Sequence, residues 1–233
     1  MNSRYHSFIS KVNQALLKMK HSYAFVGGMA VGLYETRELA VDLRPTEDLD
    51  CVVGITTRGK YFLLQERLRA IGFTEDTSDG APICRWKYDD ITVDIMPLEG
   101  DVLGFTNPWY GPGLHHVQQV KLIDGSTVPI FSFPYFLASK LVAMNHRDGG
   151  VDLRWNHDFE DVLHLLVHRK EVLTEIQASE KEVQSFLLGE FKKLLIRPLL
   201  LKEAIHAHFV YKTYPREAEQ EVFGLILKII NMK

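Results

Sequence analysis

Cysteine, long apolar runs and net charge are all scarce in this sequence, and each shortage excludes a class of protein. Only two cysteines, Cys51 and Cys84, occur among the 233 residues, and both lie in apolar segments of strand-like composition. They fit reduced thiols in a protein core better than a disulfide framework of the kind that small secreted domains use. No apolar run approaches the roughly 18 residues of a transmembrane helix, so the sequence predicts no membrane span.

The net charge is only −3, which gives the chain no general attraction to nucleic acids or anionic membranes. Basic residues are spread among the apolar residues of the N-terminal segment, and no secretory signal is visible there. The ten histidines do not stand at zinc-ligand spacing with cysteine or glutamate, and no Cys-His or Ser-His nucleophile pattern is present. We therefore expect a globular cytoplasmic protein that has no membrane partner.

The spacing of apolar residues predicts a mixed first part and a helical second part. Short runs of β-branched and aromatic residues predict strands at 23–28, 48–55, 83–88, 91–98 and 128–133. Helical spacing predicts helices at 5–19, 29–39, 58–71, 135–147, 157–169, 180–196 and 217–232. We expect an α+β fold in which residues 1–132 form a small mixed sheet flanked by helices and residues 133–233 form a helical domain.

Three acidic residues stand in the predicted strands. Side chains alternate along a strand, so Asp48 and Asp50 point to the same face, about 6–7 Å apart at their Cα atoms. Asp94 stands between Val93 and Ile95 in a later strand, and it completes a three-carboxylate cluster if that strand pairs beside the first. Such charges repel one another unless a cation lies among them. Mg²⁺ prefers hard oxygen ligands, and its binding there suits phosphoryl or nucleotidyl transfer.

Two glycines, Gly27 and Gly28, end the apolar strand that precedes these acids. Without side chains, their backbone can approach a phosphate closely, and a helix that starts after Gly28 supplies free N–H groups. Taken alone, a Gly-Gly pair is usually only a tight turn, and an Asp-x-Asp pair is usually a surface or capping feature. Their combination in one strand–helix–strand context favours a site for phosphates and a metal.

The set "GG", "TEDLD" and "VDI" resembles the nucleotidyltransferase superfamily that has a DNA polymerase β-type core. The order Arg44, Thr46, Asp48, Asp50 is similar to bacterial branches of that superfamily, among them the AbiEii-like toxins and small nucleotidyltransferases near them. The segment "ASKLVAMNHRDGGVDLRWNHDFEDVLHLL" also resembles the helical half of those branches. The likeness covers roughly residues 23–166, and the helices after residue 170 match nothing that we can name.

The resemblance implies a role for each residue of the core motif. Gly27 and Gly28 would hold the triphosphate of the nucleotide. Asp48 and Asp50 would bind two Mg²⁺ ions, with Mn²⁺ as an alternative. Asp94 would be the third metal ligand and the base that helps to activate the acceptor hydroxyl.

The resemblance also implies nucleotide contacts outside the acid motif. Lys140 corresponds to the lysine of the helical half that contacts a phosphate. Arg44 and Thr46 would either support the acid-bearing loop or touch the nucleotide. Arg147 is a further candidate for nucleotide binding, although helical salt pairs look the same in a sequence.

Two features leave alternatives open. Asp158 and Asp161 would either contact the base of the nucleotide or only cap and brace helices. Trp109 and Tyr110 lie in the Gly- and Pro-rich loop 104–116, where aromatic rings either stack on a substrate or simply pack.

The activity that we expect is Mg²⁺-dependent transfer of a nucleoside monophosphate from an NTP, with ATP among the candidate donors. The acceptor hydroxyl would belong to an RNA end such as tRNA, to a protein or to a small molecule. If the protein is a toxin, an antitoxin would be its partner. One alternative is a non-catalytic nucleotide-binding module of a regulatory or defence system, which the intact set of three acids disfavours. Another is a metal-dependent nuclease or phosphohydrolase that uses the same acids, which the Gly-Gly pair disfavours because a nuclease needs no triphosphate site.

Overall fold

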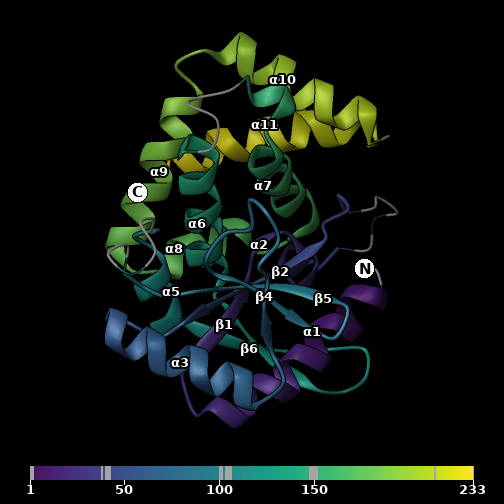
Figure 1. Cartoon of the computed structure of the whole chain (residues 1–233). Helices are drawn as coiled ribbons and strands as arrows, with labels where there is room; N and C mark the ends of the chain where they lie inside the picture. The colour runs from purple at the N-terminus through teal and green to yellow at the C-terminus, as the bar shows by residue number, and fades with distance from the viewer. Residues whose placement is uncertain are drawn as a thin grey trace. The chain divides into compact units, whose positions relative to one another are not determined.

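The structure is a computed structural model that describes residues 3–37, 39, 43–99, 102, 107–146, 152–212 and 214–232. The chain forms two compact units, whose elements are shown in Figure 1. The first comprises Met1–Leu33 with Arg44–Ser132, and the second comprises Tyr34–Leu43 with Phe133–Lys233. The sequence did not predict that residues 34–43 would leave the first unit, and the assignment of catalysis to residues 1–132 stays a prediction.

The first unit is built on a seven-stranded mixed sheet with the order β3-β4-β5-β2-β1-β7-β6. Its strands are β1 Tyr23–Val26, β2 Asp48–Val53, β3 Thr74–Glu75, β4 Arg85–Tyr88, β5 Ile91–Met96, β6 Val117–Lys121 and β7 Thr127–Phe131. Its helices are α1 Ser3–Leu16, α2 Gly27–Ala30, α3 Arg58–Ala70 and α5 Tyr110–His115, with the 3₁₀ turn η1 Leu17–Met19. β2 pairs with β1 in antiparallel and with β5 in parallel orientation, which puts the acid-bearing strands side by side.

The burial of β2 follows the alternation that the sequence predicts. Asp48 and Asp50 are partly exposed, whereas Leu49 and Cys51 are fully buried. Over residues 48–51 the strand thus carries its carboxylates on one face and its apolar side chains on the other. The neighbouring β1 is buried along its whole length, so the acids stand at the edge of the apolar core.

The second unit consists mainly of helices. They are α6 Phe133–His146, α7 His157–His168, α8 Val172–Ala178, α9 Lys181–Leu194, α10 Pro198–Tyr211 and α11 Arg216–Ile230, with the 3₁₀ turn η4 Leu153–Trp155. The N-terminus of α7 is capped by Asn156, whose side chain accepts a hydrogen bond of 2.9 Å from the N–H of Phe159. Aromatic rings with almost no exposed surface fill the core of this unit, among them those of Tyr34, Phe133, Phe136, Phe159 and Phe191.

Residues 34–37 belong to the second unit because they bond to the end of α7. The N–H groups of Thr36 and Arg37 both donate to the carbonyl oxygen of His168, each at 2.9 Å. The ring of Tyr34 stacks on that of Phe136, with centroids 4.3 Å apart. These contacts stop the helical turns of η2, Val31–Tyr34, at Tyr34. The predicted helix over 29–39 is therefore wrong at residues 35–37, because tertiary hydrogen bonds replace the helical ones.

The α+β fold class is confirmed, and all five predicted strands occur. The predicted helices at 5–19 and 58–71 and the four in the second part also occur. The sequence missed the strands β3 and β6 and the helices α5, α8 and α10, which are short or lack a clear apolar stripe. In the described part of the chain, no helix combines the length and apolar character that crossing a membrane requires.

Candidate functional site

The three predicted acids of the first unit are brought together by strand register. Asp50 of β2 lies opposite Asp94 of β5, and Asp94 lies opposite Arg85 of β4. Cross-strand partners point to the same face of a sheet, so these three side chains form one row across three strands. Asp48 stands two residues before Asp50 and therefore joins the same face. Asp94 is the most buried of the acids, with 7% of its surface exposed.

Arg85 lies among these carboxylates. Its Nε donates to Asp94 Oδ1 at 2.8 Å, and its Nη2 donates to Asp94 Oδ2 at 2.7 Å and to Asp48 Oδ2 at 2.9 Å. The hydrogen bonds to Asp94 raise the pKa of Arg85 above its ordinary value, so the guanidinium is firmly charged. We call Arg85, Asp48 and Asp94 the site cluster.

Sequence reasoning missed Arg85, although a signal for it was present. The predicted hairpin turns at Asp89 and Asp90, and a two-residue turn sets the register of both strands. That register places residue 85 opposite residue 94, as the structure shows. Asp89 has a φ of 53°, the left-handed conformation that such a turn requires.

The glycine turn lies directly against the acids. Gly27 has a φ of +72°, and a Cβ atom there would come within 1.8 Å of Asp50 Oδ2. A side chain at this position would therefore collide with the carboxylate, so only glycine fits both the conformation and the space. A Cβ on Gly28 would lie 3.2 Å from Arg44 Nη2 and 3.3 Å from Thr46 Oγ1.

Thr46 connects the glycine turn to the first acid. Its hydroxyl donates to Asp48 Oδ1 at 3.0 Å, and its N–H donates to the hydroxyl of Tyr5 at 3.0 Å. The segment before β2 is thus held in place on both sides. The first unit therefore brings together seven of the nine predicted site residues, namely Gly27, Gly28, Arg44, Thr46, Asp48, Asp50 and Asp94.

The acids are not arranged as a metal site in this structure. Over the described ranges, no group of three histidine, cysteine, aspartate or glutamate side chains converges as metal ligands do. Arg85 accounts for part of this, because its Nη2 bridges one oxygen of Asp48 and one of Asp94.

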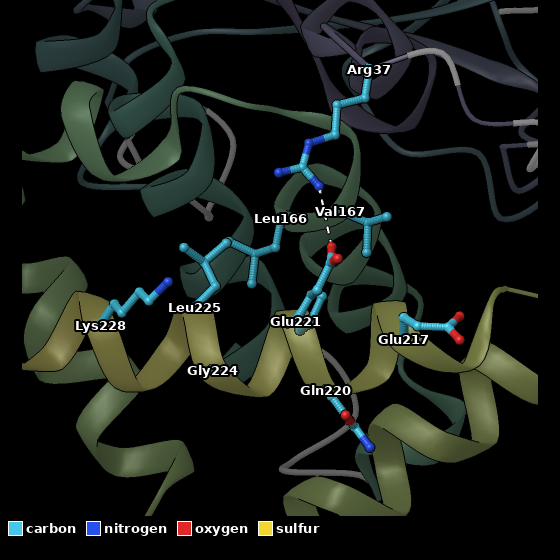
Figure 2. Close-up of a pocket in the computed structure, with 10 residues that line it drawn as sticks. Arg37, Leu166, Val167, Glu217, Gln220, Glu221, Gly224, Leu225 and Lys228 are labelled. Atoms are coloured by element: carbon cyan, nitrogen blue, oxygen red, sulfur yellow. Dashed lines mark hydrogen bonds and ion pairs between the residues drawn. The ribbon is translucent and has the colours of Figure 1, made fainter.

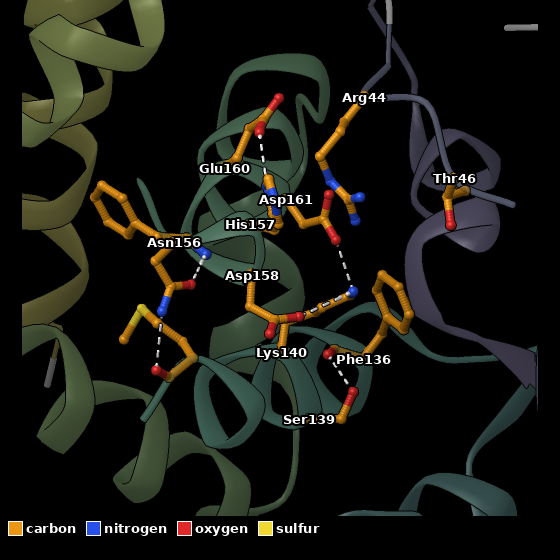
Figure 3. Close-up of polar contacts among 12 residues, drawn as sticks. Arg44, Thr46, Phe136, Ser139, Lys140, Asn156, His157, Asp158, Glu160 and Asp161 are labelled. Atoms are coloured by element: carbon orange, nitrogen blue, oxygen red, sulfur yellow. Dashed lines mark hydrogen bonds and ion pairs between the residues drawn. The ribbon is translucent and has the colours of Figure 1, made fainter. Parts of the chain in front are cut away.

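Lys140 forms a second ion cluster, inside the second unit (Figure 3). Its Nζ donates to Asp161 Oδ2 at 2.7 Å and lies 3.4 Å from Asp158 Oδ1. The three side chains come from α6 and α7 and are at most 8% exposed. We call them the helix cluster. These contacts support the bracing role that the sequence left open for the two aspartates, while Arg147 lies outside the described residues.

The aromatic residues of loop 104–116 pack within the first unit. Trp109 is buried, and Tyr110 begins α5. The hydroxyl of Tyr110 lies 3.4 Å from Met96 Sδ, and its ring is 6.5 Å from that of Phe131. These contacts favour packing over presentation of the rings to a substrate. Residues 104–106 of the loop lie outside the described part of the chain.

The histidine pair of α7, His164 and His168, is buried in the second unit. His164 Nε2 lies 2.9 Å from Glu35 Oε1, and the rings of His164 and His168 stack 3.8 Å apart. Burial, with a smaller contribution from His164, lowers the pKa of His168 to about 4. His168 is therefore neutral at physiological pH.

A cavity of about 600 Å³ opens in the second unit beside α7 and α11 (Figure 2). Leu166 and Val167 line one part of it, and Glu221 and Lys228 line another. Arg37 donates to Glu221 Oε2 at 3.4 Å. None of the predicted site residues lines this cavity, so it is separate from the residues that the sequence singled out.

Comparison with known proteins gives a family match over most of the chain. The family model for the nucleotidyl transferase AbiEii toxin of type IV toxin–antitoxin systems matches residues 15–209. An antigenic nucleotidyltransferase-like protein from Paracoccidioides brasiliensis has a similar fold, with 20% identity and a TM-score of 0.51, over 85% of this chain and 92% of that one.

A second solved structure, the antibiotic-resistance factor ANT(2'')-Ia, shares 14% identity over 80% of this chain and 90% of its own, with a TM-score of 0.47. The Paracoccidioides brasiliensis protein supports the fold alone, and the lower TM-score of the resistance factor carries no further weight. A search of curated proteins found no match.

Proposed function

The chain belongs to the AbiEii family of nucleotidyl transferase toxins from type IV toxin–antitoxin systems, and from this premise we propose its reaction and its site. It is a nucleotidyltransferase enzyme, and the resemblance found in the sequence is confirmed. The proposed reaction moves a nucleoside monophosphate from an NTP to an acceptor hydroxyl and depends on a divalent cation. Membership in a toxin family implies an antitoxin as partner; the acceptor is an RNA end, a protein or a small molecule.

The single observation that carries the proposal is the row of acids beside the glycine turn. Asp50 lies opposite Asp94, and the backbone of Gly27 packs against the carboxylate of Asp50. A phosphate seated on the turn would therefore lie next to the acids. Carboxylates are costly to gather at the edge of a core, so their position beside the glycine turn supports a role in phosphoryl chemistry.

The three acids offer the type of ligand atom that a hard divalent cation prefers. Asp48, Asp50 and Asp94 offer carboxylate oxygens from one face of the sheet, which is the ligand type that Mg²⁺ and Mn²⁺ prefer. Cations held there would offset the charge of the triphosphate and lower the pKa of the acceptor hydroxyl. Asp94 is the residue that we assign as base, because its carboxylate can accept the proton of that hydroxyl.

Other residues of the first unit complete the proposed nucleotide site. Gly28 has no side chain to block a phosphate, and the guanidinium of Arg44 lies close to it. Arg44 can therefore pair with phosphate oxygens near the glycine turn. Thr46 holds Asp48 in place through its hydroxyl. For Lys140, a phosphate contact requires the ammonium to leave Asp161, its nearest partner.

The test is a transfer assay with each of the four NTPs labelled on the α-phosphate, in the presence of Mg²⁺. Bulk tRNA, a protein extract and hydroxylated small molecules are offered as acceptors in separate reactions. The parent should label one acceptor class, and Asp50→Asn should not. Glu47→Gln is the matched control, because Glu47 is an exposed acid on the neighbouring loop and should be dispensable.

Label that appears only with Mg²⁺ or Mn²⁺ and requires Asp50 supports the proposed site and identifies both donor and acceptor. Transfer that persists in Asp50→Asn at the parental rate contradicts the assignment of the acids. Tight NTP binding by the parent without transfer to any acceptor would favour a binding role for this chain.

A further inference from the structure

The guanidinium of Arg85 lies between two of the three acids, Asp48 and Asp94. Its Nη2 bridges Asp48 Oδ2 and Asp94 Oδ2, at 2.9 and 2.7 Å, while its Nε binds the other oxygen of Asp94. One positive charge thus already offsets the mutual repulsion of two carboxylates. A cation shared by those same two oxygens needs the bridging nitrogen to leave, or the carboxylates to turn away from it.

The contacts of Arg85 separate a fixed backbone from an exchangeable side chain. Its N–H donates to the carbonyl oxygen of Pro82 at 2.9 Å, and its own carbonyl oxygen accepts from the N–H of Asp76 at 3.1 Å. Its side chain is 27% exposed and reaches the acids from the first residue of β4. The long side chain can therefore turn toward solvent while the strand stays in place.

We propose that Arg85 is a positioning residue that serves as the resident counter-cation of the site cluster and competes with divalent cations for Asp48 and Asp94. This proposal rests on the metal site proposed above. Strand register places the three acids on one face, and the guanidinium between Asp48 and Asp94 explains why they do not converge as metal ligands in the described residues. The guanidinium holds the acids together until a divalent cation displaces it.

Competition makes a prediction that a packing role does not. Removal of the guanidinium should weaken the cation-free protein and, at the same time, strengthen cation binding. A residue that only packs, or only orients the carboxylates, would weaken both. The change in stability and the change in cation affinity are therefore measured together in the same variants. Neither measurement needs nucleotide or catalytic activity.

The experiment is isothermal titration of Mg²⁺ and, separately, Mn²⁺ into the parent, Arg85→Gln and Arg85→Lys, with the melting temperature measured with and without cation. We expect Arg85→Gln to bind the cation about tenfold more tightly, which is about 1.4 kcal/mol. Arg85→Lys should lie between the two, because it keeps the charge but loses the two-pronged contact. Arg69→Gln is the control, since it removes an equal charge from the helix α3.

If the parent binds the cation and Arg85→Gln binds it no better, competition is overturned while the metal site stands. Should neither protein bind, both proposals fall. Where Arg85→Gln fails to fold, Arg85→Lys decides, and affinity equal to or below the parental value overturns the inference. Arg69→Gln should match the parent, and an equal gain there would assign the effect to general charge.

Discussion

The two units each contain one basic side chain held between two aspartates, and the two clusters differ in their exposure to water. In the site cluster, the side chains of Arg85, Asp48 and Asp94 are 27%, 37% and 11% exposed. In the helix cluster, no side chain exceeds 8%. Each cluster joins one basic side chain to two aspartates, and we attribute the difference in their expected behaviour mainly to burial.

Burial decides whether an ion pair can exchange its partner. Water can replace a lost contact in the site cluster, so the guanidinium can leave at moderate cost. In the helix cluster, the loss of the lysine would remove a counter-charge from two buried carboxylates, which is far more costly. The comparison therefore predicts an exchangeable cluster in the first unit and a bracing cluster in the second.

The largest expected effect is that of Lys140→Met on stability. The change keeps the length of the side chain but leaves Asp158 and Asp161 without their ammonium partner, and we expect a loss of about 3–5 kcal/mol. Denaturant unfolding measures it. Adding Asp158→Asn and Asp161→Asn should recover part of the loss by removing the buried charges. A variant that keeps its stability but loses transfer would instead make Lys140 a phosphate contact.

The next effect is that of Asp48→Asn, which should lower the transfer rate strongly and the stability only slightly. Asparagine keeps the shape of the residue and removes a charge from a crowded, partly exposed cluster, so the stability should change little. The transfer rate should fall by at least about 10²–10³-fold, the typical loss when a group that stabilises the transition state is removed. Parallel assays of rate and melting temperature on Asp48→Asn and Asp161→Asn test this. Equal losses of stability in Asp48→Asn and Asp161→Asn would contradict the distinction between an exchangeable site cluster and a bracing helix cluster.

The interior of the second unit also predicts a pH dependence. Burial lowers the pKa of His168 to about 4 in the fold, whereas an unfolded histidine has a pKa of about 6.5. Between these values the unfolded state binds more protons, so stability is lost as the pH falls from about 6.5 to 4, by up to about 3 kcal/mol.

Unfolding free energies across this pH range measure the effect. His168→Phe keeps a ring beside His164 but removes the titrating group. The free energy of unfolding of this variant should therefore depend less on pH than that of the parent. His206→Gln serves as the control, because the side chain of His206 is 64% exposed and its replacement leaves the interior intact. If His168→Phe retained the full slope, another group would be responsible.

The elements that carry strong local signals could be predicted from the sequence. Alternation along β2 placed Asp48 and Asp50 on one face, and the glycines marked the end of β1. The α+β class followed from the change in apolar spacing near Pro134. These features depend on neighbouring residues, which a single sequence displays directly.

Features that depend on tertiary contacts could not be predicted in the same way. Residues 34–37 look helical in sequence, but Thr36 and Arg37 find their partner in the carbonyl group of His168, far along the chain. Lys140 was assigned to a phosphate by resemblance, since nothing in the sequence shows that α7 delivers two carboxylates to it. The position of Arg85 opposite Asp94 could have been predicted, but only from the register of the hairpin.

The smallest expected effect is that of Arg85→Gln on stability in the absence of divalent cations. The pair is partly exposed, so its loss should be about 1 kcal/mol, or about 2–4 °C in the melting temperature of a chain of this size. Thermal unfolding in a chelator measures it, with Lys140→Met run beside it. A loss as large as that of Lys140→Met would mean that Arg85 braces the first unit as Lys140 braces the second. A small loss means that exposure, rather than the residues themselves, separates a cluster that can exchange its cation from one that cannot.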